Sequence, residues 1–273
     1  MHPYLGVDVA LATKHQKEEQ FTPAFSELGV KINVAPIDTD QLGTFSGEVA
    51  RIGSAEDALR KKARLGMEHL SLPFGLASEG SIGSDPYIPF INSDIEMAIW
   101  IDDVRGFEII ERFRSLDIVA IREEVTRASD IDAILEKADF PRHGLIIKGS
   151  QDHLYKGITN RYDVDEALSQ IWRVGDVAII ESDLRAHMSP SRRVNISEVA
   201  SRLAKRLKEL CPSCQTPGWG RVGTLRGVHC ESCGRANDDA IRGEIEGCAL
   251  CGEKQEKVLR EVIDPGSCRF CNP

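Results

Sequence analysis

Every cysteine of this chain lies in its last quarter, where the eight residues form four Cys-x-x-Cys pairs. Two thiolates separated by two residues on a tight turn can occupy two corners of a tetrahedron around a metal ion. Two such pairs complete a four-sulfur shell, so eight cysteines suffice for two ions. The spacing therefore predicts two zinc sites, with the ligands Cys211, Cys214, Cys230, Cys233, Cys248, Cys251, Cys268 and Cys271.

The alternative use of such cysteines is a disulfide framework, which depends on the compartment. The start of the chain lacks the basic segment and long apolar core of a secretory signal, and no stretch approaches the roughly 20 apolar residues of a membrane span. We therefore expect a cytoplasmic protein without a membrane segment, in which thiols stay reduced and bind metal. Iron–sulfur ligation also uses four cysteines, but regularly spaced pairs fit the hairpins of a zinc ribbon better.

The sequence leaves two ways to divide the pairs between two ions. Sequential pairing joins the first pair with the second, whereas interleaved pairing, as in cross-braced zinc folds, joins the first with the third. We expect sequential pairing because it closes shorter loops. Either arrangement fills each ion's shell with thiolates, so the predicted zinc ions are structural. A segment of this size with few large apolar side chains needs such ions to fold.

Before Cys211, apolar β-branched runs alternate with amphipathic helical patterns. Ser54 and Asp57 are spaced to cap a helix, and Asn195 with Glu198 resembles a capping box at the start of the last helix before the cysteines. The alternation predicts an α/β domain, a mixed sheet flanked by helices, over residues 1–210. A small zinc-ribbon-type module over residues 211–273 follows.

The charge distribution bears on the partners of the chain. The net charge is -9, and the cysteine-rich segment is close to neutral. A nucleic-acid-binding surface normally shows an excess of Lys and Arg, so we do not expect a nucleic-acid partner. The chain also has no P-loop, and its first predicted strand with the following turn, "GVDVALATKHQK", has no Gly-x-Gly-x-x-Gly motif.

Two basic stretches interrupt the apolar pattern. "ATKHQKEEQF" connects a predicted strand to a predicted helix, where cations beside the helix-start N–H groups favour an anion. "DLRAHMSPSRR" carries arginines whose guanidinium groups are suited to clamp a phosphate. The structural alternative is a solvated loop in the first case and surface arginines beside a turn in the second. The candidate anion-binding residues are Thr13, His15, Lys17, Arg185, Arg192 and Arg193.

Two further stretches carry carboxylates among small residues. "DTDQLGTFSGEVAR" contains Asp38, Asp40 and Glu48, which are suited to a hard divalent cation such as Mg²⁺, or else belong to an ordinary turn. "LASEGSIG" follows an apolar strand and contains Glu79 at a position where α/β sheets place ligands. Its alternative is a Ser/Gly turn with an exposed acid.

These stretches carry two resemblances. End to end, the chain resembles a bacterial family of unknown function, through the four quoted stretches and the terminal "DPGSCRFCNP". More remotely, the order of the body's motifs is similar to that of the inosine-triphosphate pyrophosphatase superfamily. That superfamily has a Ser/Thr-x-Asn-x-x-Lys motif after its first strand, then a Glu entering a helix, an acidic Ser/Gly loop and a Ser-His-Arg segment. Here His15 replaces the Asn, Lys17 comes one residue early, and "MSPSRR" lacks the central His.

The second resemblance implies a metal-dependent hydrolase that releases pyrophosphate from nucleoside triphosphates or related phosphoanhydrides. Glu48 and Glu79 would hold Mg²⁺, and Lys17 and Arg192 would neutralise the phosphates. The alternative from another class is a non-catalytic protein that binds a nucleotide, a phosphorylated small molecule or another anion. Its zinc module would then dock a protein or nucleic-acid partner, of which the charge favours protein.

Overall fold

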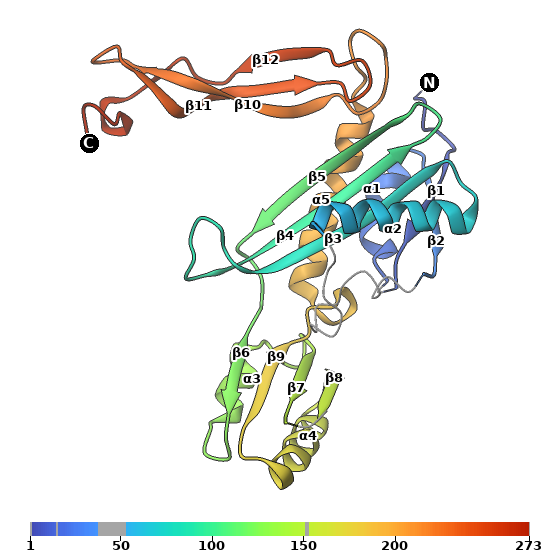
Figure 1. The fold of residues 1–273 in the computed structure, drawn as a ribbon, viewed down its shortest axis with the longest axis vertical. Helices are drawn as coiled ribbons and strands as arrows, with labels where there is room; N and C mark the ends of the chain where they lie inside the picture. The colour runs from blue at the N-terminus through green and yellow to red at the C-terminus, as the bar shows by residue number, and fades with distance from the viewer. Residues whose placement is uncertain (1, 15, 38–52, 151–152, 273) are drawn as a thin grey trace.

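The computed structural model describes residues 2–14, 16–37, 53–150 and 153–272, and its main sheet has five strands (Figure 1). The order across the sheet is β2-β1-β3-β4-β5; β1 runs parallel to β2 and β3, whereas β4 is antiparallel to β3 and β5. The sheet is therefore mixed, as predicted. Its strands are β1 (Asp8–Ala12), β2 (Lys31–Ala35), β3 (Phe74–Ser84), β4 (Asn92–Asp102) and β5 (Phe107–Ser115).

Helices cover both faces of this sheet. α1 (Glu18–Glu27) and α5 (Pro190–Lys208) pack together on one face, and α2 (Ala55–Leu70) crosses the other (Figure 1). Alternate residues of β4 face opposite helices, because side chains along a strand alternate between the two faces. Trp100 accordingly belongs to the core under α1 and α5, whereas Ile99 belongs to the core under α2.

The chain changes faces between β1 and β3. β1 leads through α1, on one face, to β2, and the connection from β2 returns through α2, on the other face, to β3. In open α/β sheets, the carboxyl ends of the strands at such a reversal are the usual place for ligands. β3 pairs with β1 only at residues 75 and 76 and continues to Ser84, well past the end of β1. The loop after β1 therefore lies beside the middle of β3.

A second sheet is inserted between β5 and α5 (Figure 1). Its order is β6-β9-β7-β8, every neighbouring pair is antiparallel, and its own apolar core packs against α3 and α4. The sequence predicts a single sheet before Cys211, and the structure corrects this, because an apolar run does not show which partner strand it will pair with. The inserted elements are β6 (Arg122–Val125), α3 (Ile131–Lys137), β7 (Leu145–Lys148), β8 (Leu154–Ile158), α4 (Arg161–Val174), β9 (Ala178–Ser182) and η2 (Ala186–Met188).

The cysteine-rich segment forms a third sheet, a long ribbon that leaves the body at the end of α5 (Figure 1). The order of its strands is β12-β11-β10-β13. A strand rises about 3.3 Å per residue, so β10 alone separates its two ends by roughly 35 Å. The elements are β10 (Gly220–Cys230), β11 (Ala236–Gly247), β12 (Lys254–Val258), β13 (Val262–Ile263) and η3 (Pro265–Ser267).

Two predicted helix starts have different outcomes. Ser54 and Asp57 form a reciprocal capping box at the start of α2, as predicted. Asn195 does not start α5, which begins six residues earlier with Ser189 as N-cap and Pro190 in the first turn, where proline's missing N–H costs nothing. Among the described residues, no helix is long and apolar enough to span a membrane.

Candidate functional site

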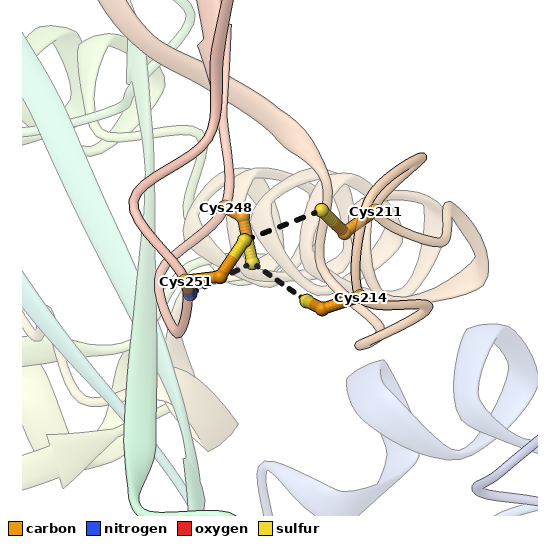
Figure 2. Close-up of side chains that lie close together, drawn as sticks. All are labelled: Cys211, Cys214, Cys248 and Cys251. Carbon is orange, nitrogen blue, oxygen red and sulfur yellow. Dashed lines mark hydrogen bonds between the residues drawn. The ribbon is translucent and has the colours of Figure 1, made fainter.

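Four cysteines gather where the ribbon meets the body. Cys211 and Cys214 follow α5, and Cys248 and Cys251 lie on the turn after β11; their four sulfur atoms face one another (Figure 2). Cys211 Sγ lies 3.7 Å from Cys251 Sγ, and Cys214 Sγ lies 3.7 Å from Cys248 Sγ. With zinc–sulfur bonds of about 2.3 Å, the edge of a tetrahedron is about 3.8 Å, so these distances fit a zinc site. They exclude disulfides, whose sulfur atoms lie about 2.05 Å apart.

A second group of four cysteines occupies the far end of the ribbon. Cys230 and Cys233 lie on the turn between β10 and β11, and Cys268 and Cys271 lie near the C-terminus. Cys230 Sγ lies 3.8 Å from Cys271 Sγ, and Cys233 Sγ lies 3.8 Å from Cys268 Sγ. Backbone N–H groups also point at ligand sulfur, as from Phe270 to Cys268 Sγ at 3.4 Å, which is favourable for a thiolate.

The pairing of the cysteines is interleaved, and the expectation of sequential pairing is wrong. The first pair meets the third, and the second meets the fourth. Sequential pairing would join the two ends of β10, which the extended strand holds roughly 35 Å apart. Loop closure entropy favours the shorter loop in a flexible chain, but here the β10–β11 hairpin returns the chain to its starting point. Each group offers four thiolates, which leaves no open position for a substrate on a tetrahedral ion.

The body contains a different kind of cluster, near the end of β1. Six charged side chains lie at no more than 9% exposure, although such side chains are rarely buried unless paired or functional. We call this group the buried charge cluster. It consists of Lys17, Lys62, Glu79, Asp94, Glu96 and Arg192.

Lys17 lies at the centre of the cluster, between β1 and α1. Its Nζ donates to the Ser78 hydroxyl at 3.0 Å and to the Ser78 carbonyl at 3.3 Å, on the part of β3 that extends beyond β1. Burial, and then the Arg192 guanidinium, lower the pKa of Lys17 to about 7, while Glu96 and Glu79 act in the opposite direction. Lys17 therefore exchanges its proton near neutral pH.

Glu79 and Glu96 lie on opposite faces of the sheet. Glu79 pairs in register with Met97 and faces α2, where its carboxylate forms an ion pair with Lys62. Glu96 pairs in register with Gly80 and faces α5, where Arg192 Nε donates to Glu96 Oε1 at 2.6 Å. The same segment of β3 is thus flanked by one ion pair on each face of the sheet.

One of the small residues next to Glu79, Gly80, has a steric role. A Cβ at Gly80 would lie 2.4 Å from Glu96 Oε1 and 2.6 Å from Arg192 Nη2, closer than any packed carbon approaches. The glycine therefore makes room for the ion pair between Arg192 and Glu96.

Asp94 completes the cluster, two residues before Glu96 on the same face of β4. Asn195 Nδ2, one turn after Arg192 on α5, donates to Asp94 Oδ2 at 2.9 Å. Burial, and then the neighbouring Glu96 carboxylate, raise the pKa of Asp94 to about 7. Arg192 and Asn195, on the buried face of α5, thus lie over the two acids in the first half of β4.

The predicted body residues divide into three groups. Lys17, Glu79 and Arg192 meet in the cluster, and Thr13 is buried beside it, with its Oγ1 accepting from the Lys17 N–H at 3.4 Å. Arg185 instead pairs with Asp183 at 2.5 Å beyond the inserted sheet, and Arg193 follows Arg192 on a half-exposed side of α5. Four predicted residues lie outside the described residues: His15, Asp38, Asp40 and Glu48.

Sequence analysis missed Lys62, Asp94, Glu96 and Asn195. The signal for the two acids was available, because Asp94, Glu96, Ala98 and Trp100 share one face of a strand whose later members are buried. Lys62 similarly follows Leu59 by three positions, on the buried face of an amphipathic helix. A charged residue at a core position marks a site better than charge in a loop.

Of the two resemblances, the comparisons with known proteins support the one to a family of unknown function. Neither a curated protein nor a solved structure matches it. A family model described as a domain of unknown function, DUF6671, matches residues 62–273, from α2 through both cysteine groups. The chain therefore belongs to the DUF6671 family.

Proposed function

We propose that the buried charge cluster binds a nucleoside triphosphate or a related phosphoanhydride with Mg²⁺ and hydrolyses it to release pyrophosphate. The observation that carries the proposal is that Lys17, at the carboxyl end of β1 where the sheet reverses its topology, interacts electrostatically with a buried ion pair on each face of β3. Burying so many charges is unfavourable for folding alone, because each loses its hydration. A site for a charged ligand and a cation accounts for both signs of charge.

Two carboxylates of the cluster fit a divalent cation. Among the described residues, neither Asp94 Oδ1 nor Glu96 Oε2 accepts a hydrogen bond, although both residues are fully buried. Carboxylate oxygens are the ligands that Mg²⁺ prefers, together with phosphate oxygens of a substrate. Mg²⁺ held there supplies charge neutralisation and polarisation of a phosphate oxygen. Glu79, the acid predicted from the sequence, faces the other side of the sheet and would act through Lys62.

The bases of the cluster have roles that follow from their positions. Arg192 presents a fixed guanidinium beside Glu96, and such a group neutralises charge on phosphate oxygens. Lys17 donates two side-chain hydrogen bonds to Ser78 and exchanges a proton near pH 7, so it can protonate the leaving pyrophosphate. A phosphate beside Lys17 would also raise its pKa and keep it charged until the transfer.

The test measures pyrophosphate release by the full chain with Mg²⁺ over a panel of standard and deaminated nucleoside triphosphates. Lys17→Gln and Glu79→Gln should each lower kcat/KM by roughly 100-fold or more, since single charge-stabilising groups contribute factors of that order. Lys61→Gln is the matched control, an exposed lysine of α2, and should stay within twofold. Absence of pyrophosphate release across the panel, or an unchanged rate of release in Lys17→Gln, would refute the proposed hydrolase activity.

A second function is favoured by one observation: Glu79 and Glu96 already form ion pairs with Lys62 and Arg192. A site balanced in this way can bind an anion without catalysing its reaction. In that case the ribbon, with two structural Zn²⁺ ions, would dock a protein partner. A ligand that raises the melting temperature of the wild type and not of Lys17→Gln, without turnover, would establish this function instead.

A further inference from the structure

A serine, a histidine and an aspartate are hydrogen-bonded in series where the inserted sheet meets α5. His143 Nδ1 lies 2.9 Å from Asp139 Oδ2, and His143 Nε2 lies 2.9 Å from Ser191 Oγ. The histidine is 2% exposed, whereas Ser191 is half-buried. This is the order and spacing of a nucleophile, its general base and the acid that orients the base.

The three residues border a cavity of about 640 Å³, a size typical of small-molecule sites. The cavity lies between the linker after β5, the start of α5 and the turn after α3. Most of the cavity wall is apolar, and Arg142 contributes a cation at its edge. The wall residues that decide the ligand class are Phe113, Leu116, Ile118, Val119, Val194 and Arg142.

We propose that Ser191, His143 and Asp139 form a second catalytic site, which hydrolyses esters with a small apolar acyl group. This activity is independent of the buried charge cluster. Ser191 and Arg192 are consecutive on α5, so their side chains diverge by about 100° around the helix axis. Arg192 therefore faces the main sheet, and Ser191 faces His143.

The proposed ester hydrolysis needs water as its only co-reactant. Ser191 Oγ forms a bond to the ester carbonyl carbon, and its proton moves to His143 Nε2. The carbon–oxygen bond to the alcohol then breaks, and the departing alcohol takes that proton. Water attacks the acyl-serine, gives a proton to His143, and the proton returns to Ser191 Oγ as the carboxylic acid leaves. Asp139 accepts the hydrogen bond from His143 Nδ1–H throughout and so fixes the imidazole in the required tautomer.

The surroundings of the serine suit this role. Ser191 lies in the first turn of the 19-residue helix α5, where the partial positive charge of the helix favours a developing oxyanion. The Val119 N–H donates to Ser191 Oγ at 3.2 Å and leaves a second lone pair for attack. Burial lowers the pKa of His143 against the opposing effect of Asp139, which keeps the imidazole available as a base at neutral pH.

The experiment treats the full chain with a fluorophosphonate probe and with p-nitrophenyl butyrate. Intact-protein and peptide mass spectrometry should place the phosphonyl adduct on Ser191. Ester hydrolysis should fall at least 100-fold in Ser191→Ala and in His143→Gln. Ser197→Ala is the matched control, because Ser197 is an exposed serine of the same helix, and it should keep wild-type labelling and turnover.

A purely structural tie between the inserted sheet and α5 predicts a different result. Ser191→Ala would then change the melting temperature, while the folded wild type would carry no adduct on Ser191. An adduct whose rate of formation is the same in wild type and His143→Gln would also overturn the proposal. The adduct is measured on the folded wild-type protein, so an unfolded variant cannot hide either outcome.

Discussion

The cysteine ribbon and the buried charge cluster concentrate chemical groups in opposite ways. In the ribbon, ligands up to 41 positions apart are brought together by the pairing of neighbouring strands, and little apolar core surrounds them. In the cluster, Lys17 and Arg192 come from opposite ends of the body and meet only because α1 and α5 pack on one sheet. The ribbon therefore depends on its ligand for structure, whereas the fold alone holds the charges of the cluster in place.

The largest expected effect follows from removing the metal. Structural zinc contributes on the order of 10–16 kcal/mol per site to folding, and the small ribbon clusters cannot replace that amount. A strong chelator should unfold residues 211–273 and leave the body folded. Hydrogen exchange should show β10 and β11 losing protection while β3 and β4 keep theirs, and elemental analysis of the untreated protein should find two zinc ions per chain.

The same contrast can be tested at one cysteine group. Cys233→Ser removes a ligand from the far group and should release one zinc ion together with protection at that end of the ribbon. The neighbouring Ser232→Ala, an exposed residue of the same turn, should retain both ions. A ribbon that keeps its protection after chelation would show that strand pairing alone holds it and would break the comparison.

Breaking the ion pair under α5 should have the next largest effect. Arg192→Met leaves Glu96 as an uncompensated buried charge, which costs about 3–5 kcal/mol of the free energy of unfolding. Urea denaturation of Arg192→Met, compared with the half-exposed neighbour Arg193→Met, measures the difference, and the control should lie within about 0.5 kcal/mol of wild type. Adding Glu96→Met to Arg192→Met should restore most of the loss; if it does not, packing rather than charge explains the effect.

The same contrast determines how far the sequence could predict each region. The eight cysteines could be predicted as metal ligands because their spacing is a local signal in the sequence. Their pairing could not, because it depends on the length of β10. Lys17, Glu79 and Arg192 were found through motif order, and the structure does bring them together.

Lys62 was missed because it lies inside a predicted helix, and Asp94 and Glu96 because they precede the apolar run "MAIWI" that was interpreted as a strand. A charged side chain on a buried face was the available signal, but the partners of these charges became known only with the facing helix. The inserted sheet was missed for a related reason, since the sequence of a strand of four or five residues does not show which strands it pairs with.

The cluster should also produce a pH dependence of its own, in addition to that of the metal-binding thiolates. Between pH 7 and 10.5 the unfolded chain protonates Lys17 and the folded chain does not, so stability should rise with pH. Between pH 3.8 and 7 the folded chain binds the extra proton, on Asp94, so this residue makes stability fall as pH rises. Each limb should span roughly 4–5 kcal/mol.

Variants separate the two limbs of that curve. Lys17→Met should flatten the alkaline limb and leave the acid limb, and Asp94→Asn should do the reverse, as measured by urea denaturation at a series of pH values. A pH profile of Lys17→Met that is parallel to wild type above pH 7 would show that the lysine stays charged in the folded protein.

The smallest effect we predict concerns the space that β3 leaves for the cluster. Gly80→Ala places a methyl group against Glu96 Oε1 and Arg192 Nη2, and overpacking of this kind costs about 1–3 kcal/mol. Gly83→Ala is the matched control, since the same strand offers its Cβ nothing within 4 Å. Thermal denaturation should rank Gly80→Ala below wild type and Gly83→Ala near it. Because the ion pair must shift to admit the methyl group, Gly80→Ala should also weaken triphosphate binding. Equal stability and binding in the two variants would mean that the pair is free to move, and the fold alone would then not hold the charges of the cluster in place.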